Sequence, residues 1–158
     1  MTAAYYKDQY WVLHGKLPMF GKGMEESLEP VPAADFHRPV GHRTIAQLIG
    51  HIVAWRRNTA LRLQKLPRPK IELNSPEDWP DYSGKSKTDM LRELAETHQL
   101  MRQAIEAFDY TTLEHTLHPD YYYQNRHLID GAIQHDIYHL GQINLLVSIL
   151  QAKSPESA

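Results

Sequence analysis

Two histidines near the C-terminal end of the chain, His135 and His139, are four residues apart. In an α-helix this spacing places both imidazoles on one face, one turn apart, where they can ligate a single metal ion. Because the chain contains 10 His among 158 residues, roughly 0.6 pairs at this spacing are expected by chance. The spacing alone is therefore weak evidence for a metal site, and the position of the pair on its helix is the stronger evidence.

The pattern around the pair places both histidines in the middle of an apolar stripe. The other members of that stripe are Leu128, Ala132, Ile143, Leu146 and Leu150. A helix buries such a stripe, and a buried imidazole without a partner is costly. Two interpretations remain open: two core histidines with hydrogen-bonded neighbours, or two ligands of a metal site that takes a third ligand from another element.

Two histidines on other predicted helices are candidates for that third ligand. His51 lies at the edge of the apolar stripe of its helix, near Leu48 and Trp55, and His98 lies within the stripe of the following helix. Periodicity slightly favours His98 and does not decide. For the remaining histidines we expect solvent-facing or capping roles; they are His14, His37, His42, His115, His118 and His127.

Helical periodicity is strong in three segments and weaker in a fourth. The strong segments are residues 44–66, 86–108 and 125–151, and the weaker one is 3–16. Thr44 with Gln47 has the pattern of a capping box, and Ser86 and Asn125 are predicted N-caps of the next two helices. No stretch alternates convincingly as a β-strand, so we predict an all-α fold, a four-helix bundle.

The four helices predict a single domain over residues 1–152, followed by a disordered tail at 153–158. The connection 67–85 is rich in proline, and its length predicts a crossover between two helices of the bundle. A second connection, 109–124, contains Tyr121, Tyr122 and Tyr123. These tyrosines either wall a site or anchor the connection to the bundle, and the sequence leaves both open.

Composition excludes several classes of protein. Hydrophobic residues make up 42% and charged residues 23% of the chain, as in soluble globular proteins. The net charge of −2 gives no electrostatic footprint for nucleic acid or for an anionic membrane. Without cysteine there is no disulfide, thiolate ligand or cysteine nucleophile, so any thiol must come from a substrate. With no apolar run of about 18 residues and no signal-peptide core, we expect a cytoplasmic protein.

Two segments carry a family resemblance. Residues 41–55, GHRTIAQLIGHIVAW, resemble the second-helix signature of the DinB/YfiT-like metalloenzyme family, the DinB superfamily. Residues 135–143, HDIYHLGQI, resemble the last-helix motif of the same family, a His-x-x-x-His pair followed by x-Gly-Gln. The two motifs occur in the expected order and at the expected distance, and the likeness extends from about Trp11 to Leu150.

The resemblance implies a fold and a metal site. The fold is a four-helix bundle, described for the family as up-down-down-up with a crossover, which suits the long 67–85 connection. The site is a three-histidine metal centre, carried here by His51, His135 and His139, with zinc or nickel as the usual metal. His98 is then a core or pocket-lining residue, and a homodimer is the expected assembly.

Three neutral imidazoles leave the charge of a divalent metal uncompensated, so water bound to it becomes acidic, and a thiolate could occupy the same open position. The open position would face a pocket walled by Tyr121–Tyr123 and by Trp55 or His98. Gln142, one turn after His139, is best placed to orient a ligand ring, and Asp136 and Tyr138 are alternatives.

Two classes of function follow from the resemblance. The first is a metal-dependent enzyme acting on a small molecule, either a transferase that uses a low-molecular-weight thiol or a hydrolase, with no catalytic residue identified by sequence. The alternative is a non-catalytic metal-binding stress-response bundle that acts as a dimer. The alternative gains support because no Glu or Asp is predicted beside the histidine pair on its inward face to act as a general base.

Overall fold

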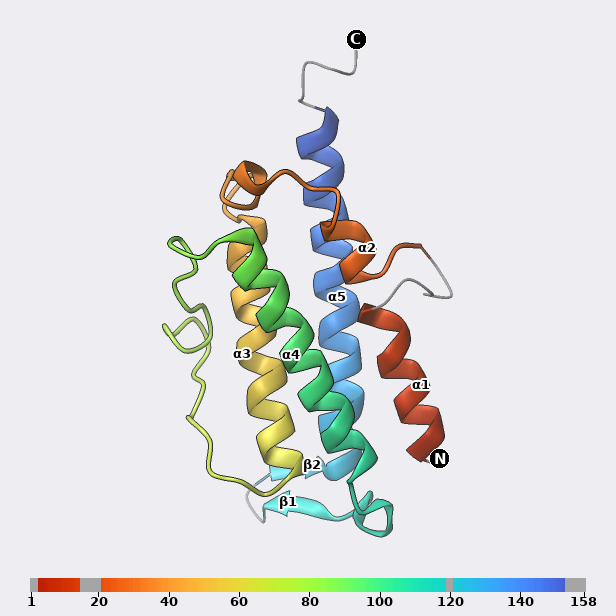
Figure 1. The fold of residues 1–158 in the computed structure, drawn as a ribbon. Coiled ribbons are helices and arrows are strands. Elements are labelled where there is room, and N and C mark those ends of the chain that lie inside the picture. The colour runs from red at the N-terminus through yellow and green to blue at the C-terminus, as the bar shows by residue number, and fades with distance from the viewer. Residues whose placement is uncertain (1–2, 15–20, 119–120, 153–158) are drawn as a thin grey trace.

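The computed structural model describes residues 3–14, 21–118 and 121–152 of the chain (Figure 1). Within these ranges the long helices are α1 (Ala3–His14), α3 (Ile45–Leu63), α4 (Lys87–Glu106) and α5 (Asn125–Ala152). A short helix, α2 (Met24–Leu28), and two 3-10 turns, η1 (Ala33–Phe36) and η2 (Tyr110–Thr112), lie in the connections. α3 packs against both α4 and α5, and α1 packs against the same two helices. The predicted all-α fold is confirmed, and the predicted tail at 153–158 lies outside the described residues.

The helices run in two directions. In Figure 1, α1 and α5 run upward, whereas α3 and α4 both run downward. The connection between α3 and α4 therefore returns along the outside of α3, from its lower end to the upper end of α4 (Figure 1). Its length follows from this path, because the chain must travel the whole height of the bundle before α4 begins.

Local sequence signals set the starts of α3 and α4. The Thr44 hydroxyl accepts a hydrogen bond from the Gln47 backbone N–H at 3.1 Å, and the Gln47 side chain accepts from the Thr44 N–H at 3.0 Å. The Ser86 hydroxyl accepts from the Asp89 N–H at 3.1 Å. Both predicted caps are therefore confirmed. The predicted cap at Asn125 is wrong, because Asn125 lies within α5 and its amide donates to the Thr112 carbonyl at 2.8 Å.

One short β-hairpin departs from the prediction that the chain has no strands. β1 (Thr116–His118) pairs antiparallel with β2 (Tyr121–Gln124), with Thr116 opposite Gln124. Strands of three and four residues are too short for alternation to be visible in a sequence. The three consecutive tyrosines, Tyr121–Tyr123, therefore lie in β2, which leads directly into α5.

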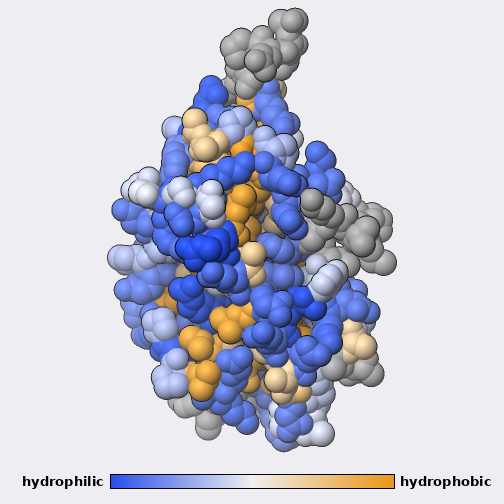
Figure 2. All heavy atoms as spheres, viewed as in Figure 1, coloured by the Kyte–Doolittle hydropathy of each residue, from blue (hydrophilic) through white to orange (hydrophobic). Residues whose placement is uncertain are grey.

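Two buried apolar clusters hold the bundle together. The first lies among α2, α3, α4 and the C-terminal half of α5, and the second joins α1 to α4 and to the ends of α3 and α5 that lie near the hairpin. Representative members of the two clusters are Phe36, Ile49, Ile52, Leu94 and Ile143 in the first, and Tyr6, Tyr10, Met101, Ile105 and Ile129 in the second. Hydrophilic residues cover most of the face seen in Figure 2, with small apolar groups between them. No helix of the described residues is long and apolar enough to span a membrane.

Gly50 lets the long connection pack against α3. Tyr82 of the connection is 5% exposed, and its hydroxyl donates to Glu93 on α4. A Cβ atom at Gly50 would lie 2.8 Å from Cδ2 of the Tyr82 ring, which is too close for the ring to stay in place. The absence of a side chain at Gly50 therefore fixes how the connection lies on α3, one residue before His51.

We expect Gly50→Ala to destabilise the protein, although alanine favours a helix over glycine by about 1 kcal/mol. Overpacking against Tyr82 should cost about 1–3 kcal/mol, so the net free energy of unfolding should fall. Gly131→Ala is the matched control, because Gly131 is an exposed glycine of α5 whose added Cβ would meet nothing within 4 Å. Urea unfolding should show opposite signs for the two variants, and equal stabilisation of both would contradict the packing argument.

Candidate metal centre

Three histidines from two helices meet in the middle of the bundle. His51 comes from α3, and His135 and His139 come from α5; one nitrogen of each ring lies within 4.8 Å of the others. The Nε2 atoms of His51 and His135 are 3.0 Å apart. His51 and His139 are buried, whereas His135 is half-buried. These are the three residues that the family resemblance assigned to a metal site.

The spacing of the His51 and His135 nitrogens is close to that of a transition-metal site. Zinc–imidazole bonds of about 2.0–2.1 Å in a tetrahedral site place ligand nitrogens roughly 3.3 Å apart. The His51 and His135 nitrogens therefore need to separate by only a few tenths of an ångström to hold an ion between them. A set of three imidazoles suits zinc, nickel, copper or iron.

Hydrogen bonds engage Nδ1 of two of the rings and leave Nε2 as the nitrogen with a lone pair. The Nδ1 atom of His51 is 2.8 Å from the Asp78 carbonyl oxygen, which can only accept, so Nδ1 donates and Nε2 keeps its lone pair. In the same way Nδ1 of His139 donates to the Gln142 side-chain oxygen at 2.7 Å. Such bonds fix the tautomer and orientation of metal-binding histidines. Gln142 therefore lies where the sequence predicted a ring-orienting residue.

Burial keeps these two imidazoles neutral. It lowers the pKa of His51 and lowers the pKa of His139 to about 4. Near neutral pH both rings are therefore unprotonated, and their Nε2 lone pairs are available to a metal without loss of a proton.

Asp78 is a site residue that the sequence did not indicate. Its carboxylate lies 3.0 Å from Nδ1 of His51 and accepts hydrogen bonds from the Trp55 indole at 2.7 Å and from the Asn74 N–H at 2.8 Å. Burial alone would raise the pKa of Asp78, but the hydrogen bonds from Trp55 and Asn74 outweigh it and hold this pKa below its usual value. The adjacent Trp79 stacks on the His51 ring with centroids 4.1 Å apart. The sequence signal that could have pointed to this part of the connection is Trp79, a large aromatic residue in a proline-rich segment.

Asp136 corrects the prediction that no carboxylate lies on the inward side of α5. Its side chain is 1% exposed and accepts a hydrogen bond from Nε of Arg56 at 2.9 Å. The prediction failed because α5 contacts α1 as well as α3, so more than one face of this helix is inward. Asp136 Oδ1 is 3.8 Å from Nδ1 of His135, beyond hydrogen-bond distance. Tyr138 is the third residue that we considered for orienting a ligand ring. It is 63% exposed, and its ring packs T-shaped against the His139 ring.

His98 lies away from the three-histidine cluster. Its ring stacks with Tyr10, at a centroid distance of 4.8 Å, and with His14, at 4.5 Å. Burial, together with the nearby charge of Arg56, lowers the pKa of His98 to about 2. His98 is therefore a neutral core residue, and the slight preference that periodicity gave it was wrong.

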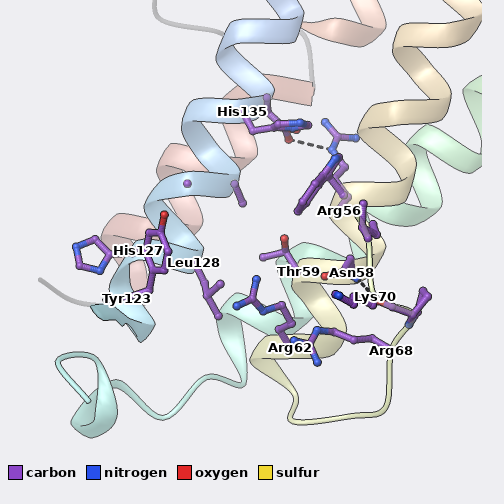
Figure 3. A pocket seen from close by; sticks show the side chains of 16 residues that line it. Arg56, Asn58, Thr59, Arg62, Arg68, Lys70, Tyr123, His127, Leu128 and His135 are labelled. Carbon is purple, nitrogen blue, oxygen red and sulfur yellow. Dashed lines mark hydrogen bonds and ion pairs between the residues drawn. The ribbon is translucent and has the colours of Figure 1, made fainter. Parts of the chain in front are cut away.

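A cavity of about 480 Å³ opens beside His135 (Figure 3). The predicted walls were Tyr121–Tyr123 with Trp55 or His98. Trp55 and Tyr123 do line the cavity, whereas His98 does not. The side chains at 121 and 122 lie outside the described part of the structure. A small molecule in this cavity would reach one edge of the histidine cluster.

Comparison with known proteins identifies the family. The family model of the DinB superfamily matches residues 22–143, a span that contains all three clustered histidines. No curated protein and no solved structure matches the chain significantly. Since the family match covers most of the sequence and agrees with the helical fold, the chain belongs to the DinB superfamily.

Proposed function

We propose that His51, His135 and His139 bind one divalent transition metal, zinc or nickel, and that the protein is a metal-dependent enzyme acting on a small molecule. The observation that carries this proposal is the convergence of three imidazoles from two helices at the edge of a cavity. Two of the rings already have Nδ1 committed to Asp78 and Gln142. The site is thus arranged for a ligand at the Nε2 side.

A metal held by three protein ligands keeps one coordination position open. It would supply a Lewis acid that lowers the pKa of a water or thiol bound at that position. The protein itself orients the rings and limits access of water. Trp79 covers one face of His51, and the Arg43 guanidinium lies 3.7 Å over the Trp79 ring, so this side of the cluster is closed. Access is from the cavity beside His135.

Transfer of a low-molecular-weight thiol is the reaction that we favour slightly over hydrolysis. Both carboxylates near the cluster are engaged: Asp78 accepts from Trp55 and Asn74, and Asp136 accepts from Arg56. Neither carboxylate is therefore free to act as a general base. A reaction with a thiolate nucleophile would not need one. The same observation supports a non-catalytic metal-binding bundle as the second candidate, and the cavity argues for catalysis.

We also propose that the protein acts as a homodimer, as the family resemblance implies, and that it is cytoplasmic, as its composition led us to expect. The outer face of α5 exposes three large apolar side chains that a second copy could cover; they are Ile137, Tyr138 and Leu145, each more than half exposed. Sedimentation of the purified protein would show the assembly, and a monomer at micromolar concentration would contradict it.

The open position can be tested with cobalt in place of the native metal. Thiols and azide should bind to the cobalt-substituted protein and change its visible absorption spectrum, because an open position accepts outside ligands. A screen of thiols with electrophilic substrates would then separate transfer from hydrolysis. A spectrum that responds to no thiol, anion or substrate would favour the non-catalytic bundle.

Gln142→Leu should weaken metal binding by about 10- to 100-fold, the usual effect of removing a group that orients a metal-binding histidine. The His139 ring would lose the acceptor of its Nδ1 proton while keeping its own side chain. Gln134→Leu is the matched control, because Gln134 is exposed on the same helix. Competition with a chromophoric chelator measures both affinities, and equal affinities would show that Gln142 does not act on the metal.

The bundle should stay largely helical without metal. Its two apolar clusters draw residues from all four long helices and supply the core, so folding should not require a metal at the site. Circular dichroism in the presence of a chelator should retain the helical signal, while added metal should raise the unfolding temperature by mass action. Complete loss of helix on chelation would instead indicate a structural site whose binding energy drives folding.

A further inference from the structure

The three clustered rings differ in how their Nδ1 atoms are engaged. Nδ1 of His51 and Nδ1 of His139 each donate a hydrogen bond to a neighbouring oxygen. Nδ1 of His135 has no hydrogen-bond partner among the described residues, and Oδ1 of Asp136 lies 3.8 Å from it. His135 is therefore the ring of the cluster that lacks an acceptor to orient it.

One oxygen of the Asp136 carboxylate is buried without a donor. Oδ2 accepts from Nε of Arg56 at 2.9 Å, whereas Oδ1 has no hydrogen-bond partner within the described part of the chain. The Asp136 side chain is 1% exposed, and a buried carboxylate oxygen without a donor is costly. An unsatisfied acceptor therefore lies next to the imidazole that lacks one.

Arg56 fixes the position of Asp136 from the other side. Its guanidinium also donates to the Leu94 carbonyl at 3.1 Å and contacts the Met24 sulfur at 3.2 Å. A dashed line beside His135 in Figure 3 marks the Arg56–Asp136 pair. The carboxylate cannot turn toward His135 without losing this partner. His135, which is half-buried at the edge of the cavity, is the side chain with room to move.

The contact between His51 and His135 indicates which nitrogen of His135 carries the proton. Nδ1 of the neutral His51 ring donates to a carbonyl, so Nε2 of His51 can only accept. Nε2 of His135, 3.0 Å away, is then the donor. In a neutral His135 ring this leaves a lone pair on Nδ1. Two acceptors, Nδ1 of His135 and Oδ1 of Asp136, then face each other, which accounts for the gap of 3.8 Å.

Metal binding through Nε2 requires the other tautomer of His135. The ring loses its Nε2 proton to solvent and takes one up at Nδ1, so its charge is unchanged. We propose that Asp136 is the positioning residue of His135, and that in the metal-bound protein Nδ1 of His135 donates a hydrogen bond to Oδ1 of Asp136. Arg56 acts through Asp136 by holding the carboxylate in place. This inference rests on the proposed metal centre and adds the residues that orient its third ligand.

Tyr10 is a second buried donor near this carboxylate. Its hydroxyl has no hydrogen-bond partner among the described residues, and burial, with a contribution from the charge of Asp136, raises its pKa well above the usual value. A carboxylate oxygen can accept more than one hydrogen bond, so donation from Tyr10 does not exclude donation from His135. The test must therefore follow the Nδ1 proton of His135 itself.

Two double variants separate the acceptor at position 136 from the buried charge. Arg56→Met/Asp136→Leu removes both charges and the acceptor. Arg56→Met/Asp136→Asn removes both charges but keeps an amide oxygen that can accept from His135. The leucine variant should bind zinc about 10- to 100-fold more weakly than wild type, and the asparagine variant should recover part of this loss. Competition with a chromophoric chelator measures the three affinities.

Met101→Ala controls for a loss of stability without a change at the site. Met101 is buried in the second apolar cluster, on α4, which carries none of the three clustered histidines. Its truncation should lower the urea unfolding midpoint by leaving a cavity and should leave the zinc affinity unchanged. The leucine double variant should show the reverse, with a midpoint near that of wild type and a lower zinc affinity. A purely structural role of Asp136 would not give this reversal.

The proton on His135 gives a direct readout by NMR. With nitrogen-15-labelled histidine, two-bond couplings report which nitrogen of each ring is protonated. His135 should carry its proton on Nε2 in the metal-free protein and on Nδ1 in the zinc-loaded protein. That Nδ1 proton should exchange slowly with water in wild type and faster in the leucine double variant, which has no acceptor for it.

The outcomes separate this inference from the proposed function. If wild type binds no zinc, the metal centre fails and the role of Asp136 fails with it. If wild type and the leucine double variant bind zinc equally well, the role of Asp136 is overturned and the metal centre stands. An Nδ1 proton of His135 that exchanges equally fast in the two zinc-loaded proteins would overturn the hydrogen bond to Asp136 in the same way.

Discussion

Replacing His51 by Ala should abolish stoichiometric binding of zinc or nickel, whereas His98→Ala should largely retain it. Without His51, only the His135–His139 pair of α5 remains, and two imidazoles on one helix bind a metal weakly compared with three ligands from two elements. His98 contacts Tyr10 and His14 instead of the cluster, so its removal leaves the three nitrogens in place. The wild-type protein should bind one metal per chain.

The measurement is metal content after exhaustive dialysis, by elemental analysis, for wild type and both variants. Each substitution removes a buried ring, and His51→Ala also removes the partner on which Trp79 stacks. Circular dichroism and unfolding midpoints must therefore show that both variants are folded at the temperature used. The opposite pattern, with metal lost only in His98→Ala, would mean that the third ligand has been assigned to the wrong helix.

Local chemistry made part of this fold predictable. The starts of α3 and α4 follow from side chains that hydrogen-bond backbone groups three residues away. The capping roles of Thr44, Gln47 and Ser86 can therefore be predicted without any tertiary information. The same is true of the His135–His139 pair, since one helix sets their relation. The family resemblance added the third residue of the cluster, His51, which periodicity alone could not have selected.

The rest of the site depends on how elements face one another. A helical pattern gives the direction of His51 and His98 relative to their own axes, but not which helix faces α5. Asp78 reaches His51 from an irregular connection that has no periodicity to read. Asp136 was misplaced for a related reason, because a helix enclosed on several sides has more than one inward face. Each miss is a tertiary contact that short-range patterns do not encode.

The ion pair between Arg56 of α3 and Asp136 of α5 lies in the interior of the bundle. Both side chains are 1% exposed, and Nε of Arg56 is 2.9 Å from the Asp136 carboxylate. Arg56 also donates to the Leu94 carbonyl on α4 at 3.1 Å, so one guanidinium joins three helices. Burial alone would raise the pKa of Asp136, but the charge of Arg56 lowers it below its usual value. The carboxylate is therefore ionised and depends on this partner.

Arg56→Met should destabilise the protein by about 3–5 kcal/mol, the usual cost of leaving one member of a buried ion pair without its partner. Methionine fills a similar volume, so the loss should come from the uncompensated Asp136 carboxylate and not from a cavity. The double variant Arg56→Met/Asp136→Leu should recover most of the stability, because it leaves no buried charge. Arg92→Met, which removes an exposed arginine of α4, should change the unfolding midpoint little. Urea unfolding of the metal-free proteins gives all four values, and a double variant less stable than Arg56→Met alone would show that the pair acts through packing instead of charge.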